Sequence, residues 1–334
     1  MLVLVSGGAG YVGSRLVPKL LGDGHSVRVM DNFWFGNAGL PENNDSLKLI
    51  KGDIRDKDAV ASAMAGCNAV LHLACLSNDY SCQLEEPLSE EINIKSMEPF
   101  VRSAISQGVQ RFIYCSSSSV YGINDAPEVT EDMPCVPLTL YNRSKMLCEE
   151  VLAKYRKDFG CVTVIRPATV CGPAPRMRFD LTVNVMTMHA VMKREITVFG
   201  GEQKRPNLHI DDMCDVYKLL LDAPFEKIHG ETFNVGRQNL KVIEIAQLIK
   251  QVVEREIPGN AVKITVQPSQ DNRTYRINSD RIKRVLGFEA SRTVEQAIVD
   301  ICTHFQMGRW KDALVNPEYS NVLQYVQKHG MGKK

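Results

Sequence analysis

The sequence predicts an α/β fold with a doubly wound parallel sheet. Short apolar or β-branched runs recur through the first half of the chain, and segments of helix length separate them. Such runs are typical of parallel strands that are covered on both faces. Regular strand–helix alternation then implies right-handed βαβ units, with helices on either side of one sheet. The length, 334 residues, suffices for one large domain or for two that share a core.

Each expected element follows from its local pattern. Buried strands are expected at residues 2–6, 26–31, 47–53, 69–75, 111–117 and 162–167. Helical patterns between them cover residues 11–21, 56–65, 92–107 and 142–157. After Pro167 the pattern becomes irregular, with further strands expected at 195–200, 208–212 and 232–236 and an amphipathic helix at 242–256. A terminal helix with a frayed basic end is expected from about residue 308.

Composition narrows the class of partner. The 40 basic and 39 acidic residues leave a net charge of +1, which gives no sequence-wide case for a nucleic acid or a membrane surface. No apolar run reaches the length of a membrane span, and no basic segment precedes the N-terminal apolar residues as in a signal peptide. The ten cysteines include no C-x-x-C pair and no zinc-like spacing. We therefore expect reduced, buried cysteines in a cytoplasmic protein without a metal site.

The stretch VSGGAGYVGSRL, residues 5–16, lies between the first strand and the first helix and has the spacing Gly7-x-x-Gly10-x-x-Gly13. A dinucleotide-binding loop requires this context, although a plain strand-to-helix turn is the alternative. Gly7 allows the tight turn, Gly10 lets the backbone approach a pyrophosphate, and Gly13 lets the helix pack close to the strand. The start of the helix adds free N–H groups and a partial positive charge for the phosphates.

Two carboxylates follow the second and third strands. Asp31 ends the second strand, where an acidic side chain accepts hydrogen bonds from the adenosine ribose hydroxyls. A 2′-phosphate there would meet like charge, so NAD is favoured over NADP. Asp53 follows the third strand and is expected to hold the adenine amino group, to cap the next helix, or to do both. Asn32 and Ile54, the residues that follow these carboxylates, are placed in the same cofactor site.

Tyr141 and Lys145 in YNRSK have the i, i+4 spacing that puts both on one helical face. An ammonium beside a phenol lowers the phenol pKa toward neutrality. Such a tyrosinate can accept a proton from an alcohol while hydride leaves for a nicotinamide. The serine run CSSSSVYG, residues 115–122, ends the fifth strand at the edge where ligands bind. A hydroxyl there can orient the substrate or stabilise an oxyanion, and turn chemistry is the alternative role.

Together these residues resemble the extended short-chain dehydrogenase/reductase family, in its NAD-dependent nucleotide-sugar epimerase and dehydratase branch. The resemblance covers roughly residues 1–305 and rests on GGAGYVG, the Asp31 strand end, GDIRD, HLAC, SSSSVYG, YNRSK, RPATVCGP, RPNLHIDD and FNVG. It implies a Rossmann-type sheet, NAD as cofactor and a nucleotide-diphosphate sugar as substrate. It also implies a homodimer formed through the helices at 92–107 and 142–157 of each subunit.

On this basis the chain divides into two functional parts and a tail. Residues 1–170 are expected to form an NAD-binding Rossmann domain, to which residues 208–238 return. Residues 171–207 and 239–315 are expected to form a smaller C-terminal α/β region that binds the nucleotide sugar, and residues 316–334 form the tail.

The resemblance also implies roles for single residues. Ser117 matches the catalytic serine or threonine, Tyr141 the base, and Lys145 the residue that binds the nicotinamide ribose and tunes the tyrosine. The other residues placed in the cofactor site are Tyr11, Val12, Leu73, Ala74, Ser116 and Pro167. Those placed in the substrate site are Ser77, Asn78, Asp79, Ser118, Arg178, Asn184, Arg205 and Arg273, with Arg276 as the alternative to Arg273. The arginines suit this role because a guanidinium can bind a pyrophosphate in a bidentate way.

One departure from the family pattern bears on the reaction. In the 4,6-dehydratases of this branch the catalytic threonine is followed by aspartate and glutamate, which protonate the leaving hydroxyl; here the matching residues are Ser118 and Ser119. We therefore expect a 4-epimerase that works through a transient 4-keto intermediate. A C4 dehydrogenase with net oxidation is the alternative. A dehydratase with its acid supplied from elsewhere, such as Asp79, and a non-catalytic NAD-binding protein rank below both.

Overall fold

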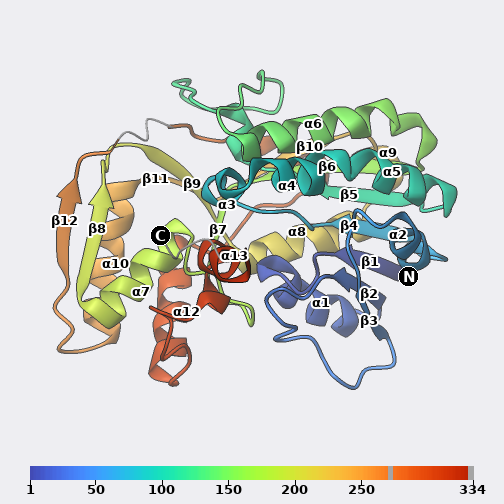
Figure 1. The fold of residues 1–334 in the computed structure, drawn as a ribbon. Coiled ribbons are helices and arrows are strands. Elements are labelled where there is room, and N and C mark those ends of the chain that lie inside the picture. Colours follow the sequence, from blue (N-terminus) through green and yellow to red (C-terminus); the bar gives the residue numbers. More distant parts are fainter. Residues whose placement is uncertain (270–273, 330–334) are drawn as a thin grey trace.

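The computed structural model describes residues 1–269 and 274–329 (Figure 1). Its centre is a seven-stranded sheet with the strand order β10-β6-β5-β4-β1-β2-β3, in which every pair of neighbours is parallel. The strands are β1 (Leu2–Ser6), β2 (Ser26–Asp31), β3 (Leu47–Lys51), β4 (Ala69–His72), β5 (Arg111–Cys115), β6 (Cys161–Pro167) and β10 (Thr232–Val235). The predicted doubly wound parallel sheet is confirmed.

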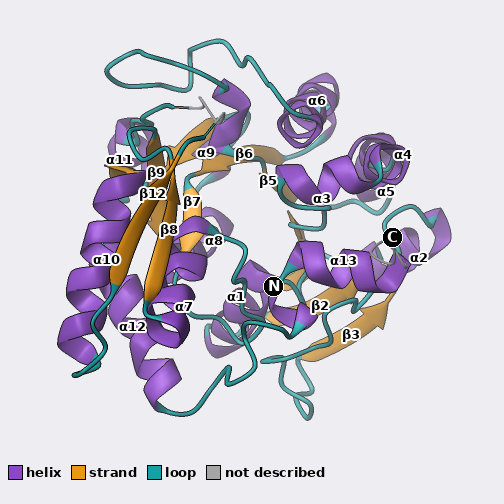
Figure 2. Cartoon of the chain, turned by 60° about the vertical axis from the view of Figure 1, so that its left-hand side comes forward, coloured by secondary structure: helices purple, strands orange, loops and turns teal. Residues whose placement is uncertain are grey.

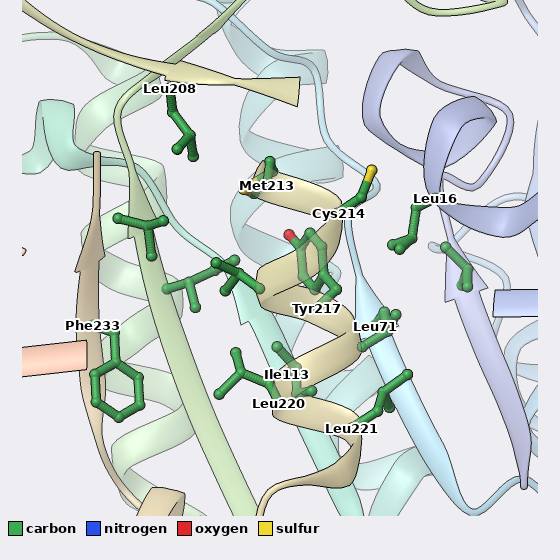
Figure 3. Packing of buried hydrophobic residues seen from close by; sticks show 14 of the residues in the cluster. Leu16, Leu71, Ile113, Leu208, Met213, Cys214, Tyr217, Leu220, Leu221 and Phe233 are labelled. Carbon is green, nitrogen blue, oxygen red and sulfur yellow. The ribbon is translucent and has the colours of Figure 1, made fainter. Parts of the chain in front are cut away.

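Helices cover both faces of this sheet because its central strands are apolar on both sides. In β1, Val3 and Val5 belong to one core cluster and Leu4 to the other. The first cluster includes side chains of α1 (Tyr11–Gly22) and α8 (Ile210–Asp222), and the second those of α2 (Lys57–Met64), α5 (Met97–Ser106) and α6 (Leu140–Lys154). Figure 3 shows Tyr217 and Leu220 of α8 packed beside Ile113 of β5.

A smaller α/β region lies beside the main sheet (Figure 2). Its core joins a two-stranded parallel sheet to three helices. These elements are β8 (Glu195–Phe199), β12 (Lys263–Gln267), α7 (Thr182–Lys193), α10 (Val242–Glu256) and α12 (Val294–Gln306). A third sheet consists of β7 (Thr169–Cys171), β9 (Lys204–His209) and β11 (Gln238–Lys241). Its strand β7 begins two residues after β6 ends. The expected helix at 242–256 matches α10, whereas sequence patterns did not indicate α7, β12 or α12.

Short helices complete the described chain. They are α3 (Asp79–Leu84), α4 (Glu86–Glu90), α9 (Phe225–Ile228), α11 (Asp280–Leu286) and α13 (Asn321–His329). The C-terminal helix α13 lies against α3, between the two halves of the molecule (Figure 1). In the part of the chain that the structure describes, no helix has the length and apolar character of a membrane span.

Three local expectations were wrong. β3 is an edge strand whose only partner is β2, so most of its side chains face solvent instead of being buried. The strand expected at 208–212 begins earlier and ends at His209, because Ile210 already starts α8. The helix expected at 92–107 is interrupted by a π-helical turn over Glu91–Lys95. That turn directs Asn93 at the backbone N–H and C=O of Leu76, a contact that periodicity does not reveal.

Candidate active site

A cavity of about 500 Å³ lies at the carboxyl ends of the main strands. The loops after β1 and β4 both line it, at the point where the strand order reverses on either side of β1. Ligands of open parallel sheets bind at this position, because the two loops turn away from each other and leave a crevice. Residues of the smaller region and of α13 line the opposite wall. The cavity is therefore bounded by segments from almost the whole length of the chain.

The glycine loop forms a narrow cradle at one end of the cavity. Gly7 has φ +75°, and a Cβ atom there would lie 2.7 Å from the backbone of Ala74. At Gly13 a Cβ atom would lie 2.5 Å from the backbone of Gly8. Gly10 is the N-cap of α1 and offers no side-chain cap to the first N–H groups of the helix. These N–H groups stay available for an anion, so the loop fits a dinucleotide pyrophosphate.

The two strand-end carboxylates also line the cavity. Asp31 accepts hydrogen bonds from the N–H groups of Ala9 (3.0 Å) and Phe33 (2.9 Å), and burial raises its pKa. Asp53 is held by Arg55, whose hydrogen bonds lower the pKa of that carboxyl group. The helix-cap role considered for Asp53 belongs instead to Asp56, which accepts hydrogen bonds from two N–H groups at the start of α2.

Three polar side chains meet on the wall beside the cradle. Lys145 Nζ donates to the carbonyl oxygen of Cys115 at 2.7 Å and lies 5.8 Å from the ring centroid of Tyr141. Ser117 Oγ lies 2.7 Å from Ser119 Oγ. Ser119 in turn donates to Asn142 Oδ1, next to Tyr141 on α6, at 2.7 Å. The end of β5 and the first turns of α6 thus bring the serine, tyrosine and lysine to one place.

The electrostatics of Tyr141 differ from the sequence expectation. Burial raises the pKa of the Tyr141 phenol, and the positive charge of Lys145 only partly opposes this shift. Burial acts in this direction because the charged phenolate loses its hydration. The helical spacing alone predicted that Lys145 would lower the phenol pKa toward neutrality. In this structure the effect of burial outweighs the effect of Lys145, and the pKa is raised.

The substrate-side residues divide into two groups. Those on the cavity wall are Ser77, Asn78, Asp79, Ser118, Arg178 and Arg205. Asn184 is not on the wall: it is fully buried and binds the Gly172 N–H, the Tyr11 hydroxyl and the Arg178 carbonyl. These bonds occupy its amide, so the structure gives it the role of bracing the wall. Arg273 lies outside the described residues.

The cofactor-side residues predicted from the sequence all reach the cavity wall, at Gly7, Gly10, Tyr11, Val12, Gly13, Asp31, Asn32, Asp53, Ile54, Leu73, Ala74, Ser116, Tyr141, Lys145 and Pro167. Further wall residues were not assigned from the sequence, among them Trp34, Arg176, Asp180, Tyr275, Asn321 and Tyr325. The arginine pair in RMRFD was the one signal that pointed to Arg176. Asn321 and Tyr325 belong to the C-terminal tail, for which the sequence predicted a terminal helix but no role at the site.

The cysteines and possible metal ligands complete the description of the site. All ten cysteines are free thiols, and seven of them are buried. Across residues 1–269 and 274–329, no group of three or more His, Cys, Asp or Glu side chains is arranged so that it could bind a metal ion.

The family model described as the NAD dependent epimerase/dehydratase family matches residues 3–236. The chain belongs to this family. The match covers the glycine loop, the serine run and the YNRSK helix, so the predicted family, its enzymatic nature and NAD as its cofactor are confirmed.

Relatives in this NAD-dependent family include UDP-glucose 4-epimerases. That of Corynebacterium glutamicum is 29% identical over 320 residues, covering 90% of this chain and 94% of its own. The solved structure of the Thermotoga maritima UDP-glucose 4-epimerase with UDP-glucose superposes with a TM-score of 0.82 at 25% identity, covering 92% of this chain and 99% of that one. A dTDP-glucose 4,6-dehydratase from Streptomyces venezuelae shares the fold, with a TM-score of 0.83 at 22% identity and coverage of 93% and 99%.

Proposed function

We propose that this protein is a nucleotide-sugar 4-epimerase that works through a transient 4-keto intermediate. The observation that carries the proposal is the meeting of Ser117, Tyr141 and Lys145 beside the glycine cradle. The residues after Ser117 support epimerisation over elimination, because Ser118 and Ser119 have no acidic side chain to protonate a leaving hydroxyl. Relatives named UDP-glucose 4-epimerase support a UDP-hexose as the first substrate to test.

The chain's own groups would act as follows. Tyr141 Oη accepts the proton of the C4 hydroxyl when the sugar is oxidised and returns it when the ketone is reduced. Lys145 opposes the effect of burial on the Tyr141 pKa and holds the carbonyl of Cys115 at the end of β5. Ser117 orients the same hydroxyl from the loop at the end of β5. NAD, when bound in the cradle, supplies the hydride acceptor at C4.

The residue roles assigned from the sequence remain part of this proposal. Asp31 would hold the adenosine ribose and so favour NAD over NADP, and Arg178 and Arg205 would face the substrate diphosphate. The NAD-binding domain at 1–170 with 208–238, and the substrate region at 171–207 and 239–315, are proposed on the same basis. The pairing of β10 with β6 supports the return of 208–238 to the main sheet.

We also propose a cytoplasmic homodimer. Ten free thiols support a reducing compartment. The helices α5 and α6 lie side by side over one face of the sheet and offer the surface through which two copies would associate (Figure 1).

A dehydratase is the second candidate, and one observation favours it. Asp79 lies on the cavity wall, and its Oδ1 accepts a hydrogen bond from Thr139 Oγ1 at 2.5 Å. Thr139 caps α6, the helix that carries Tyr141, so a carboxyl group stands close to the reaction centre. Such a group is what the elimination of water requires.

The deciding experiment incubates the purified protein with NAD and a panel of UDP-, GDP-, CDP- and dTDP-hexoses and follows the sugar by proton NMR. An inverted coupling pattern at C4 without net NADH would establish the 4-epimerase. Accumulation of a keto sugar with NADH would show a dehydrogenase instead. A 6-deoxy-4-keto product would overturn the proposal and point to Asp79 as the acid.

A further inference from the structure

Two arginines of one loop, Arg176 and Arg178, line the cavity, but their charges are balanced differently. Arg178 forms an ion pair with Asp180, with Nε 2.9 Å from Oδ1 and Nη2 3.2 Å from Oδ2. Its Nη1 donates to Ser77 Oγ at 3.0 Å. Each nitrogen of the Arg178 guanidinium therefore already has a hydrogen-bond partner, and the charge has a counter-ion.

Arg176 has no such counter-ion. The residue is only 4% exposed, and its guanidinium stacks 3.7 Å from the ring centroid of Phe35. Nη2 donates to Asn321 Oδ1, whereas Nε is buried without a hydrogen-bond partner. Among residues 1–269 and 274–329, no carboxylate oxygen lies within 4.0 Å of this guanidinium. Burial lowers the pKa of Arg176 to about 9, and the charge of Arg178 adds to this effect.

The surroundings of Arg176 place it on the cofactor side of the cavity. Its backbone N–H donates to Ser14 Oγ of α1 at 3.2 Å, close to the start of the helix that forms the phosphate cradle. Phe35, on which it stacks, follows Asp31 in the loop after β2. A buried guanidinium with a donor to spare is costly, unless an anion enters the cavity and completes its hydrogen bonds.

Asn321 holds this guanidinium from the C-terminal helix. Its Oδ1 accepts from Arg176, its Nδ2 donates to Ser77 Oγ at 2.8 Å, and its backbone N–H donates to Asp180 Oδ2 at 3.0 Å. One residue of α13 thus bridges the partners of both arginines. Because Asn321 carries no charge, it orients Arg176 without neutralising it.

We propose that Arg176 is a diphosphate-binding residue of this cavity and that Asn321 positions its guanidinium for that role. The nature of the ligand rests on the proposed function, since both NAD and a nucleotide sugar carry a diphosphate. A planar guanidinium binds such a group through two charge-assisted hydrogen bonds. The contacts with Ser14 and Phe35 favour the dinucleotide as the source.

The test compares Arg176→Met with Arg178→Met and with Arg284→Met, an exposed arginine on α11 that serves as the charge-matched control. Dissociation constants for NAD and for UDP are measured by titration calorimetry on nucleotide-free protein. We expect Arg176→Met to weaken NAD binding roughly 10- to 100-fold, the range for a lost charge-assisted contact. Arg284→Met should bind NAD as the parent protein does, and Asn321→Leu should weaken NAD binding to a smaller extent.

Melting temperatures without ligand separate this role from a structural one. Loss of an unpaired buried charge should leave the melting temperature unchanged or raise it, whereas Arg178→Met breaks an ion pair and should lower it. Weaker binding of UDP with unchanged NAD binding would assign Arg176 to the nucleotide sugar. Unchanged binding of both ligands would overturn the proposal. Since these readouts are affinities, they stand even if the NMR panel shows no epimerisation.

Discussion

Two buried arginines, in two regions of the molecule, are treated in opposite ways. Below the serine run, Arg166 forms a bidentate pair with Glu149 and donates to the Tyr121 hydroxyl, and Glu149 also accepts from Ser116. On the cavity wall, Arg176 forms one side-chain hydrogen bond and stacks on Phe35, and it has no ion-pair partner among residues 1–269 and 274–329. A scaffold keeps its buried charges paired, because an unpaired buried charge reduces stability. A ligand site has to leave some of them open. The difference therefore separates the part that holds the site from the part that binds.

The largest effect is expected at the proposed reaction centre. Tyr141→Phe removes the proposed base while keeping the ring in place on α6. We expect the turnover number to fall roughly 100- to 10,000-fold, the usual contribution of general acid–base catalysis. The NMR assay measures the rate, and the affinity for NAD should stay unchanged. An active Tyr141→Phe variant would contradict the assignment of the base.

Glu149→Gln tests how much the ion pair between Arg166 and Glu149 contributes to the stability of the scaffold. This change leaves the Arg166 guanidinium buried without its carboxylate, so the free energy of unfolding should fall by about 3–5 kcal/mol. Glu150→Gln, the exposed neighbour on the same helix, is the matched control and should stay within about 0.5 kcal/mol. Urea denaturation measures both. Equal stability of the two variants would show that the Arg166 network does not support the serine loop energetically.

A pH titration tests the scaffold further. His72 is buried, and its Nδ1 shares a hydrogen bond of 2.6 Å with Ser6 Oγ. Its ring centroid lies 4.3 Å from that of Phe100. Burial lowers its pKa to about 3, below the value near 6.5 of an unfolded histidine. The unfolded chain therefore binds the extra proton first, and stability is lost as pH falls from about 6.5 toward 3. In His72→Gln the fall should be shallower by up to about 1.4 kcal/mol per pH unit, measured by denaturation at pH 4.5–7.

The smallest effect is expected on the ligand side. Asn321→Asp places a carboxylate directly beside Arg176, which forms no ion pair among the described residues although Asp180 lies on the same cavity wall. The protein without ligand should become more stable by about 0.5–1 kcal/mol, and NAD should bind a few-fold more weakly because its diphosphate then competes with Asp. Thermal unfolding with and without NAD measures both changes. Tighter NAD binding would contradict the view that Arg176 waits for an anion.

The sequence predicted the site best where each residue follows a strand. Gly7 follows β1 directly, Asp31 is the last residue of β2, and Ser117 lies two residues beyond β5; parallel strands end at one edge of the sheet. Because the strands could be predicted, it could also be predicted that these residues lie at the same edge of the sheet. Asn184 shows the limit of this reasoning. The family resemblance predicted that Asn184 contacts the substrate diphosphate. In the structure its amide points inward and forms hydrogen bonds with Tyr11 and Gly172.

The residues that line the cavity wall opposite the sheet could not be predicted from strand ends. Asn321 contacts Ser77 across 244 positions of sequence, and Tyr325 contacts Glu85 across 240. No local propensity or periodicity encodes contacts of such separation, which depend on how the smaller region and α13 pack against the sheet. The sequence therefore predicted a terminal helix here but gave it no place at the cavity, which α13 lines through Asn321 and Tyr325.

By itself, the sequence predicted the parallel sheet, the glycine cradle, and the placement of Tyr141 and Lys145 on one helical face. These features rest on short-range rules: strand period, helix spacing and the conformational freedom of Gly7 at φ +75°. Only the tertiary structure decided which charges are paired. Arg176 and Arg178 are two residues apart and chemically identical, yet Arg178 forms an ion pair with Asp180, whereas Arg176 stacks on Phe35 and donates to the uncharged Asn321. Burial and distance set the energy of a charge, and both exist only once the chain has folded.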